Sequence, residues 1–398
     1  MITVNQALQY VWKQPLPSVK EQSLQVEDAL GQILAQDINS PISLPSFKQS
    51  SMDGYAVRFR EKENTLYNLI GEIKAGDSAN LRMQPGEAVR IFTGAPVPQH
   101  ADAVVIQEKS MVLGTQLTIQ DTPTNGQNIR PIGSQIEKGK IALTKGHYIT
   151  PASIGLLKSL GIEKLQVFQP PKVAIVITGN ELVSTGKPLE EGQIYESNSA
   201  VLKAALYQQG IDDVSIVYAK DTLEETETVL NTVLSHSDMV LISGGISVGD
   251  YDFVGKALKN LEVEELFYKV LQKPGKPLFF GKKENTFVFA LPGNPASTLT
   301  CFYVYVTLLL DRWRGSENPG LLRVQLPISK TFENTFGRAL FLKARIKNNK
   351  VEMLDQQNSA TVISFAKANA LLYISEDTQK VAENELVETL ILPYGSSN

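Results

Sequence analysis

The chain has 398 residues, whereas a single domain usually holds about 100 to 200, so we expect two to four domains. Apolar residues make up 42% of the chain and charged residues 20%, a balance that excludes wholesale disorder. The formal net charge of -4 argues against a general nucleic-acid binder, because such proteins neutralise phosphates with many lysines and arginines.

The sequence predicts a cytoplasmic protein. Its only cysteine, Cys301, stands among apolar residues, which favours core packing in a reducing compartment. The three histidines lack the spacing of zinc ligands. The N-terminus has no basic cluster before an apolar run, and the longest apolar stretch, residues 299–310, is shorter than the roughly 20 residues of a membrane-spanning helix.

In chain order, the first predicted element is a helix over residues 3–12, ended by nearby prolines. From residue 54 to about 140, short β-like runs such as 88–92 and 103–106 alternate with Gly, Pro and Asn turns, which predicts a mostly β module. A helical stretch follows Pro151 and continues through Leu160.

Residues 172 to about 315 alternate buried strands with helices, as parallel sheets do. The strand candidates are short apolar runs: 173–178, 214–218, 239–242 and 287–291. Helix-end signals stand between them, namely Ser197 or Ser199 with Gly210 beyond the far end, and Thr222 with Glu225 as a capping box. A last helix is expected over 297–314. From 320 to 394, the runs 339–346, 361–365 and 386–392 predict a small C-terminal β domain.

Acidic residues follow three of the predicted parallel strands. Ligands bind outside the carboxyl ends of such strands, where this chain has Glu181, Asp221, Asp250 and Asp252. Gathered carboxylates repel one another, and a hard cation such as Mg²⁺ offsets that cost, so these four are candidate metal ligands. The alternative is that they are helix caps and first-turn acids.

Two further segments reach the same expected edge of the sheet. Residues 243–249 are rich in glycine and precede a predicted helix, an arrangement in which backbone N–H groups approach phosphate oxygens, although a tight turn explains them as well. Lys269, Lys273 and Lys276 stand around prolines that restrict the backbone, which suits binding of an oxyanion; surface lysines are the alternative. Residues 291–297 form another stiff turn at a helix start.

Six motifs in order resemble one enzyme family over nearly the whole chain. They are SSMDGYAVR at 50–58, IFTGAPVP at 91–98, TGNELV at 178–183 with GQIYESNS at 192–199, SGGISVGDYDFV at 243–254, KPGKP at 273–277 and LPGNPAS at 291–297. This set is similar to that of the molybdopterin molybdenumtransferases, the MoeA family, which includes the E domain of gephyrin.

The resemblance implies a multidomain α/β fold. Its central unit would be a doubly wound, mostly parallel α/β domain of the molybdopterin-binding, MogA-like type at 171–316. A discontinuous helical region would occupy 1–47 and 139–170, with an inserted β domain at 48–138 and a C-terminal β barrel at 317–398. The implied protein is a homodimer of L-shaped subunits, without nucleic-acid or membrane partners.

The implied reaction inserts molybdate into adenylylated molybdopterin, releases AMP and requires Mg²⁺. Molybdate and adenylylated molybdopterin would be the anionic substrates. Contacts with a molybdopterin adenylyltransferase and with acceptor molybdoenzymes are implied as well. Two rival functions are adenylylation of molybdopterin from ATP, which related folds perform, and a non-catalytic scaffold.

The resemblance also assigns roles to single residues. The acids Glu181, Asp221, Asp250 and Asp252 would hold the cation, with Glu181 and Asp221 also taking part in catalysis. Asp53 and Thr93, ordinary turn residues by spacing alone, would be catalytic from the partner subunit's β domain, facing the α/β edge across the dimer cleft. Catalysis would further use Lys269 and Lys273. The substrate-binding residues would be Ser243, Gly244, Gly245, Ser247, Gly249, Lys276, Pro292, Pro295, Ser297, Arg338 and Ser364. The chain departs from the family at Gln135, where an acid is common, and residues 357–359 match loosely.

Overall fold

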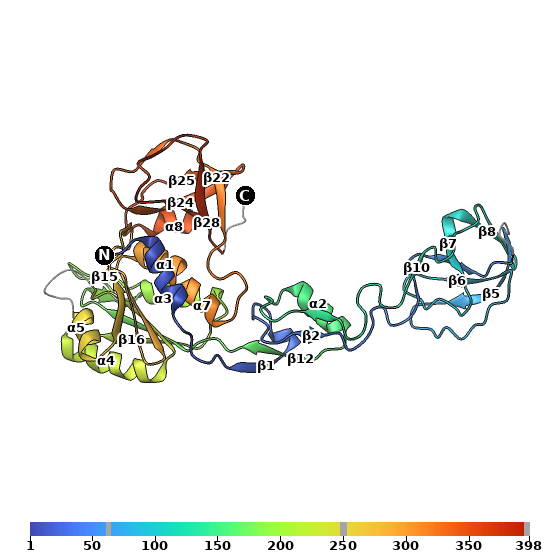
Figure 1. Ribbon diagram of the computed structural model, residues 1–398, viewed down its shortest axis with the longest axis horizontal. Helices are drawn as coiled ribbons and strands as arrows, with labels where there is room; N and C mark the ends of the chain where they lie inside the picture. Colours follow the sequence, from blue (N-terminus) through green and yellow to red (C-terminus); the bar gives the residue numbers. More distant parts are fainter. Residues whose placement is uncertain (61–64, 247–252, 394–398) are drawn as a thin grey trace.

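A computed structural model describes residues 1–60, 65–246 and 253–393. Figure 1 shows an elongated molecule in which an α/β unit and a C-terminal β unit lie together at one end. A slender connector leads from them to a separate β unit at the other end. The expected multidomain α/β fold is therefore present.

The α/β unit is built on a six-stranded sheet in the order β16-β13-β17-β21-β20-β18. Its strands are β13 (Val173–Thr178), β16 (Val214–Ala219), β17 (Met239–Ser243), β18 (Glu264–Tyr268), β20 (Phe279–Lys283) and β21 (Thr286–Leu291). The four strands predicted from apolar runs pair in parallel, as expected. The prediction missed β18 and β20. Strand β20 pairs antiparallel with both β18 and β21, and β18 and β20 each contain two charged residues.

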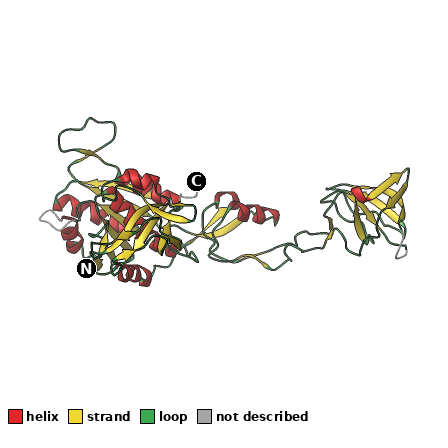
Figure 2. Cartoon of the chain, turned by 90° about the horizontal axis from the view of Figure 1, so that it is seen from above, coloured by secondary structure: helices red, strands yellow, loops and turns green. Residues whose placement is uncertain are grey.

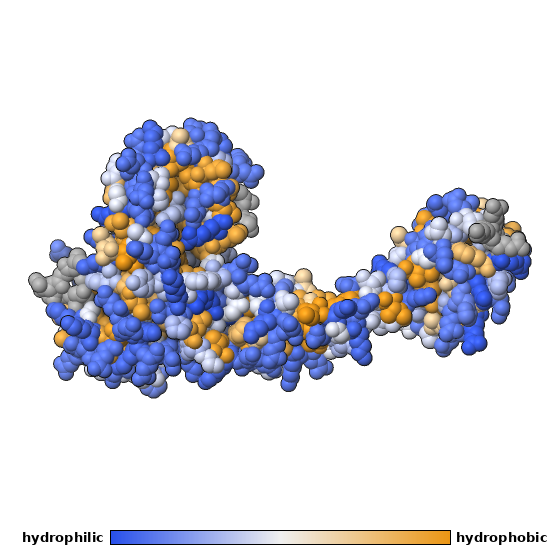
Figure 3. Space-filling view, in the orientation of Figure 1, coloured by the Kyte–Doolittle hydropathy of each residue, from blue (hydrophilic) through white to orange (hydrophobic). Residues whose placement is uncertain are grey.

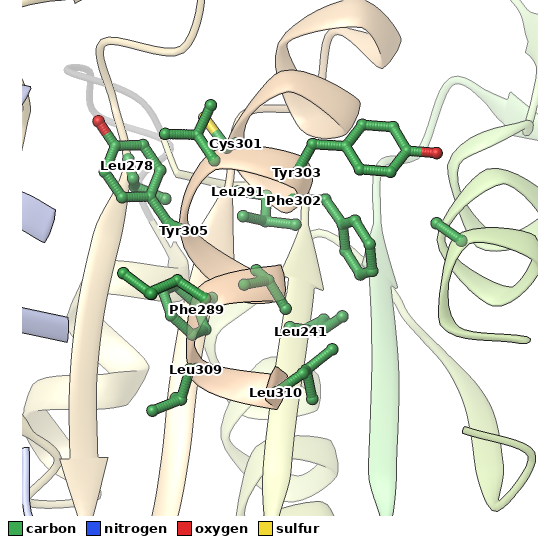
Figure 4. Packing of buried hydrophobic residues seen from close by; sticks show 14 of the residues in the cluster. Leu241, Leu278, Phe289, Leu291, Cys301, Phe302, Tyr303, Tyr305, Leu309 and Leu310 are labelled. Atoms are coloured by element: carbon green, nitrogen blue, oxygen red, sulfur yellow. The ribbon is translucent and has the colours of Figure 1, made fainter. Parts of the chain in front are cut away.

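Helices cover both faces of this sheet. They are α3 (Asn198–Gln208), α4 (Leu223–His236), α5 (Phe253–Asn260), α6 (Pro295–Cys301) and α7 (Thr307–Trp313), with a π-helical segment η3 (Phe302–Val306) joining the last two. Side chains of β13 alternate between two cores: Ile175 packs with α3 and the α6–α7 helix, and Val176 packs with α4 and α5. Figure 4 shows Phe302, Leu309 and Leu310 of the long helix lying against Leu241 and Phe289 of the strands.

The predicted helix ends are confirmed only in part. Gly210 follows α3 with a positive φ of 70°. The hydroxyl of Thr222 accepts the N–H of Glu225 at 3.4 Å, but the return bond from the Thr222 N–H to the Glu225 side chain, which a capping box needs, is absent among the described residues. Ser197 precedes α3, yet the capping bond comes from Glu196, whose carboxylate accepts the N–H of Ser199 at 2.8 Å. A carboxylate near this N-terminus suits the helix dipole better than a hydroxyl.

The connector consists of an outgoing and a returning stretch of chain that pair with each other. Its elements are β1 (Glu21–Gln25) with β12 (Lys164–Phe168), β2 (Ile38–Asn39) with β11 (Ile141–Leu143), β3 (Gln49–Ser50) with β10 (Ile129–Arg130), the 3-10 turn η1 (Val26–Asp28) and helix α2 (Pro151–Ser159). A small core around Leu34 and Leu157 stiffens its middle. Figure 2 shows how far the connector holds the two ends apart.

The distant β unit is one six-stranded sheet in the order β7-β4-β6-β5-β9-β8. Its elements are β4 (Gly54–Val57), β5 (Leu66–Ile73), β6 (Glu87–Ile91), β7 (Ala103–Ile106), the 3-10 turn η2 (Gln107–Lys109), β8 (Ser110–Leu113) and β9 (Gln116–Ile119). The runs 88–92 and 103–106 predicted from sequence are β6 and β7. Gly54 is required where β4 meets β7, because a Cβ there would lie 1.9 Å from the carbonyl oxygen of Val105.

The C-terminal unit is a β sheet in the order β19-β24-β26-β28-β22, with β25 paired to β24. Its elements are β19 (Gln272–Lys273), β22 (Arg323–Pro327), β23 (Phe332–Glu333), β24 (Ala339–Lys347), β25 (Lys350–Met353), α8 (Val362–Lys367), β26 (Ala370–Ile374), β27 (Lys380–Val381) and β28 (Leu386–Ile391). Strand β19 comes from the α/β unit and joins the two units through its backbone. Pairing of the outermost strands, β19 and β22, is absent from the described ladders, so a closed barrel stays a prediction.

The strand predicted at 361–365 is wrong, because that segment forms helix α8. Its consecutive residues Ser364 and Phe365 are both buried while Ile363 is 57% exposed, a pattern that a strand cannot produce because its side chains alternate. The neighbouring strand β26 takes this place in the sheet.

The predicted N-terminal helix is confirmed as α1 (Val4–Lys13), and Arg312 of α7 donates to the carbonyls of Val11 and Gln14. Within the described ranges, no helix is long and apolar enough to cross a membrane.

Candidate active site at the carboxyl edge of the sheet

A cavity of about 550 Å³ lies at the carboxyl ends of β13, β17 and β21. The paired short strands β14 (Leu182–Val183) and β15 (Ile194–Tyr195) line one side of it. Its lining brings together seven of the predicted residues: Glu181, Asp221, Ser243, Gly244, Gly245, Pro292 and Pro295. Ser247, Gly249, Asp250 and Asp252 lie outside the described residues.

The two acids of this cavity interact. Glu181 follows β13 and Asp221 follows β16, two neighbouring parallel strands, so both carboxylates reach the same edge. Burial raises the pKa of Asp221, and the negative charge of Glu181 raises it further. Oxygen Oδ1 of Asp221 is buried and has no hydrogen-bond partner among the described residues. The described residues thus compensate the charge of this carboxylate poorly.

The loop after β17 has room only for glycine. A Cβ on Gly244 would lie 2.4 Å from the carbonyl oxygen of Thr178, and one on Gly245 would lie 2.7 Å from the Thr178 hydroxyl. Both glycines have positive φ, 95° and 63°. Close approach of the loop to β13 therefore explains these glycines and leaves the backbone open towards the cavity.

Asn198, at the start of α3, ties the walls of the cavity together. Its Nδ2 donates to the Ser243 hydroxyl at 2.8 Å and to the carbonyl of Gly293 at 2.7 Å. Its Oδ1 is buried without a partner in the described structure, and the residue lines the cavity. Asn198 is not among the residues predicted from the sequence, although it stands in the motif at 192–199, and its amide next to a predicted helix start is the signal that indicates it.

The second wall is the start of α6. Pro292 and Pro295 line the cavity, and Ser297 is buried beside them in the first turn of the helix. Asn294 donates to the Ser359 hydroxyl at 3.1 Å, which attaches the C-terminal unit to this turn, and neighbouring Ala360 lines the cavity. Two units therefore enclose the site.

A buried network shapes the lysine-bearing loop. Nε2 of Gln272 donates to the carbonyls of Pro274 and Gly275 at 3.1 and 3.2 Å, and its Oε1 accepts the Tyr305 hydroxyl. Cys301 is fully buried against the same loop, and burial raises its pKa to about 12, so it is a packing residue as expected.

The lysines do not share the cavity with the acids. Lys273 and Pro274 line a second cavity, of about 260 Å³, whereas Pro277 lines the first. Lys269 lies over the ring of Tyr268 at 4.5 Å, and Lys276 is exposed. The expectation of one pocket for acids and lysines therefore needs correction: the loop at 273–277 separates two adjacent cavities. It does so because Lys273 belongs to β19, whose partner is the C-terminal sheet.

Arg338 and Ser364 belong to the C-terminal unit. Arg338 precedes β24, directly beside β19, since the N–H of Ala339 donates to the carbonyl of Leu271 at 3.0 Å. Ser364 is buried in α8, and its hydroxyl donates to the carbonyl of Gln356 at 3.1 Å. Arg338 thus stands near the lysine loop, whereas the hydroxyl hydrogen of Ser364 is committed within its own unit.

Asp53 and Thr93 lie in the distant β unit and are paired with each other. Both the N–H and the hydroxyl of Thr93 donate to Oδ1 of Asp53, each at 2.7 Å, and these bonds hold the pKa of Asp53 below its usual value. The nearby guanidinium of Arg90, stacked between Tyr55 and Phe92 at 4.9 Å from each ring centroid, lowers that pKa further. Within one chain this pair is separated from Glu181 by the connector (Figure 1).

Three family models together match most of the chain. They are described as the MoeA N-terminal region (domain I and II), which matches residues 2–161, a probable molybdopterin binding domain, which matches 174–312, and the MoeA C-terminal region (domain IV), which matches 325–392. A molybdopterin molybdenumtransferase of Haemophilus influenzae is 35% identical over 400 residues, covering 97% of this chain and 98% of that protein. The chain belongs to the MoeA family.

Other MoeA proteins agree in length and shape. A molybdopterin molybdenumtransferase of Staphylococcus epidermidis is 31% identical over 405 residues, covering 99% of this chain and 96% of that protein. The crystal structure of a molybdopterin biosynthesis MoeA protein from Pyrococcus horikoshii superimposes with a TM-score of 0.85 at 28% identity, covering 98% of this chain and all of that one.

The acids of this MoeA chain fit a divalent cation. The described part of the chain has no group of three or more His, Cys, Asp or Glu that could hold a metal, and two of the four predicted ligands lie outside it. The pair that is described has the chemistry a cation needs: two interacting carboxylates, one with a buried oxygen that has no hydrogen-bond partner among the described residues. Hard divalent cations take such oxygen ligands.

Proposed function

We propose that this MoeA protein inserts molybdate into adenylylated molybdopterin, releasing AMP and forming molybdenum cofactor. Its relatives from H. influenzae and S. epidermidis carry the name molybdopterin molybdenumtransferase. The observation that carries the proposal is the cavity that joins Glu181, Asp221 and the glycine loop, because an anhydride of two phosphates needs both charge compensation and close backbone approach.

Each wall of the cavity has a task in this proposal. Gly244 and Gly245 would present backbone N–H groups to the phosphates, and Asn198 holds Ser243 in place. Oδ1 of Asn198, which has no partner among the described residues, would accept a hydrogen bond from the substrate. Glu181 and Asp221, with Asp250 and Asp252, would hold Mg²⁺. When bound, that cation would supply neutralisation of the pyrophosphate charge.

The chemical step consists of hydrolysis and insertion. Water attacks one phosphorus of the anhydride, one P–O bond forms as the bridging P–O bond breaks, and AMP leaves. Lys273, with Lys269, Lys276 and Arg338, holds the molybdate dianion beside the first cavity. The two dithiolene sulfurs of the substrate bind molybdenum as one oxide ligand leaves, and the two thiol protons convert that oxide to water, so the oxidation state of molybdenum does not change. Positioning of two anions is the main contribution of these residues.

The proposal includes a homodimer in which one subunit's Asp53 and Thr93 face the other subunit's cavity. Apolar residues gather over the connector (Figure 3), and Leu30, Ile141 and Tyr148 there are each more than half exposed. An exposed apolar surface of this kind suits contact with a second copy. The four-domain division, the barrel and the contacts with an adenylyltransferase and acceptor enzymes are part of the same proposal.

Asp53→Ala and Lys273→Ala test the assignment. Each should lower the yield of cofactor from adenylylated molybdopterin and molybdate in a single turnover, by roughly ten-fold or more if the group acts on the reacting charges. Asp121→Ala and Lys259→Ala are matched controls, because these exposed residues lie in the same two units away from the described site. Unchanged yields in both site variants would rule out the assignment.

A further inference from the structure

Backbone pairing of two strands places Lys273 beside the C-terminal sheet. Strand β19 pairs in parallel with β24, with Gln272 opposite Ala339 and Lys273 opposite Leu340. The hydrogen bond from the Ala339 N–H to the carbonyl of Leu271 lies at the start of this strand pair. The turn at 334–338 directly precedes β24, so its side chains lie near Lys273.

One of those side chains, Phe336, holds the ammonium group of Lys273. Nζ of Lys273 lies 3.5 Å from the centroid of the Phe336 ring. The other cation–π contacts of the described chain are longer, at 4.5 to 5.8 Å. No ion pair or hydrogen bond of Nζ is found within residues 1–60, 65–246 and 253–393. The ring is therefore the partner that places this charge.

The turn that carries Phe336 is built around a buried side chain. Asn334 is 7% exposed; its Oδ1 accepts the N–H of Phe336 at 3.1 Å, and its Nδ2 donates to the carbonyls of Arg338 and Ser375 at 3.0 and 3.4 Å. Phe336 itself is 47% exposed, so core packing does not account for an aromatic residue at this place. A rigid turn presents the ring.

The surroundings strengthen the contact. Lys273 and Phe336 line the second cavity together with the apolar side chains of Phe332, Leu340 and Phe341. An apolar wall reduces competition from water for the ammonium group, and a less hydrated cation is attracted more strongly to a ring face. The ring leaves the ammonium charge uncancelled, which a carboxylate partner would not do.

We infer that Phe336 is a positioning residue of the anion site: its ring holds Lys273 in place for the incoming oxyanion without neutralising it. The inference rests on the proposed function. Through Phe336 the C-terminal unit acts on a loop of the α/β unit, and an aromatic side chain at this position determines how well the oxyanion is captured.

Phe336→Leu and Phe336→Trp separate this role from a structural one. Leucine keeps the apolar volume and removes the ring face, so the molybdate concentration for half-maximal yield should rise roughly two- to five-fold, while the yield at saturating molybdate stays unchanged. Tryptophan keeps a ring face and should retain the wild-type molybdate dependence. In a Lys273→Ala background, Phe336→Leu should have no further effect.

A measurement on the unaltered protein checks the geometry independently. Protons on the Lys273 side chain beside Nζ should show upfield ring-current shifts in NMR spectra, assigned by comparison with Lys273→Arg. The shifts should disappear in Phe336→Leu. Ordinary lysine shifts in the wild type, or equal molybdate dependence of the leucine and tryptophan variants, would overturn the inference. Unchanged activity of Lys273→Ala would instead contradict the proposed function, whatever Phe336 does.

Discussion

The exposed carboxylate of Asp53 is held in its ionised form by hydrogen bonds from Thr93. Two hydrogen bonds from Thr93 reach one oxygen and favour the charged form. Since the folded-state pKa lies below the unfolded value, ionisation of Asp53 contributes stability above the ordinary carboxyl pKa of about 3.9, and this contribution is lost as the pH falls through the lowered pKa. Asp53 therefore stays ionised over the whole neutral range.

Thr93→Val should raise the pKa of Asp53 towards its ordinary value, because the hydroxyl bond is lost while the backbone N–H bond remains. Titration followed by carboxyl ¹³C NMR measures the change. Glu27 is the internal control: Lys158 lowers its pKa in the connector, and the substitution should leave it unaltered. Identical Asp53 titrations in variant and wild type would show that the hydroxyl has no influence.

Among the secondary-structure elements, the ends of β13 and β17 decide the shape of the active site. The loop after β17 lies so close to Thr178 that only glycine fits at positions 244 and 245.

A buried lysine holds the loop at 356–361 of the C-terminal unit in place. Lys343 of β24 is 3% exposed, and its Nζ donates to the carbonyls of Gln356, Asn358 and Thr361 at 2.9, 3.1 and 3.2 Å. This loop carries Ser359 to Asn294 and so closes one wall of the cavity.

Gly244→Ala should destabilise the protein by roughly 2 to 5 kcal/mol, because a positive φ and a clash with the Thr178 carbonyl act together. Gly186→Ala is the matched control: its φ is +91°, similar to +95° at Gly244, but no atom lies within 4 Å of its Cβ. That variant should lose only about 1 to 2 kcal/mol from backbone strain. Urea unfolding compares them, and equal losses would contradict the close approach.

On the scale of the whole molecule, the connector separates two groups of residues that the proposed reaction needs together. Asp53 precedes β4 in the distant β unit and Glu181 follows β13 in the α/β unit. These two units lie at opposite ends of the molecule (Figures 1 and 2). A symmetric pair of chains joins them if each chain's distant unit reaches the other chain's cavity. The connector would then set how far that unit extends.

Mixing two variants of strongly reduced activity tests this arrangement. When Asp53→Ala and Lys273→Ala dimers exchange subunits at equal amounts, half of the dimers are mixed, and each mixed dimer has one site with both residues intact. About a quarter of wild-type activity should return. The two variants kept separate, and the double variant Asp53→Ala/Lys273→Ala mixed with either one, are the controls. No recovery after proven exchange would contradict a site that Asp53 and Lys273 of two different chains share.

The sequence by itself determined the parallel strands and the residues at their ends. Continuous apolar runs mark β13 and β17 as strands buried on both faces, and the edge strand β16 pairs in parallel with β13. Parallel pairing brings Glu181, Asp221 and Ser243, which stand at or after the ends of these strands, to one edge of the sheet. The motif order also identified the family. These features are local, so short windows of sequence contain them.

The tertiary structure alone decided how the units meet. Nothing near Lys273 in the sequence indicates that β19 pairs with β24, that Phe336 lies over its ammonium, or that the lysine and the acids line separate cavities. The strand predicted at 361–365 became a helix because β26 fills the sheet, and that competition is settled by packing. Contacts between residues about 60 to 90 positions apart depend on chain geometry, which local propensity does not contain.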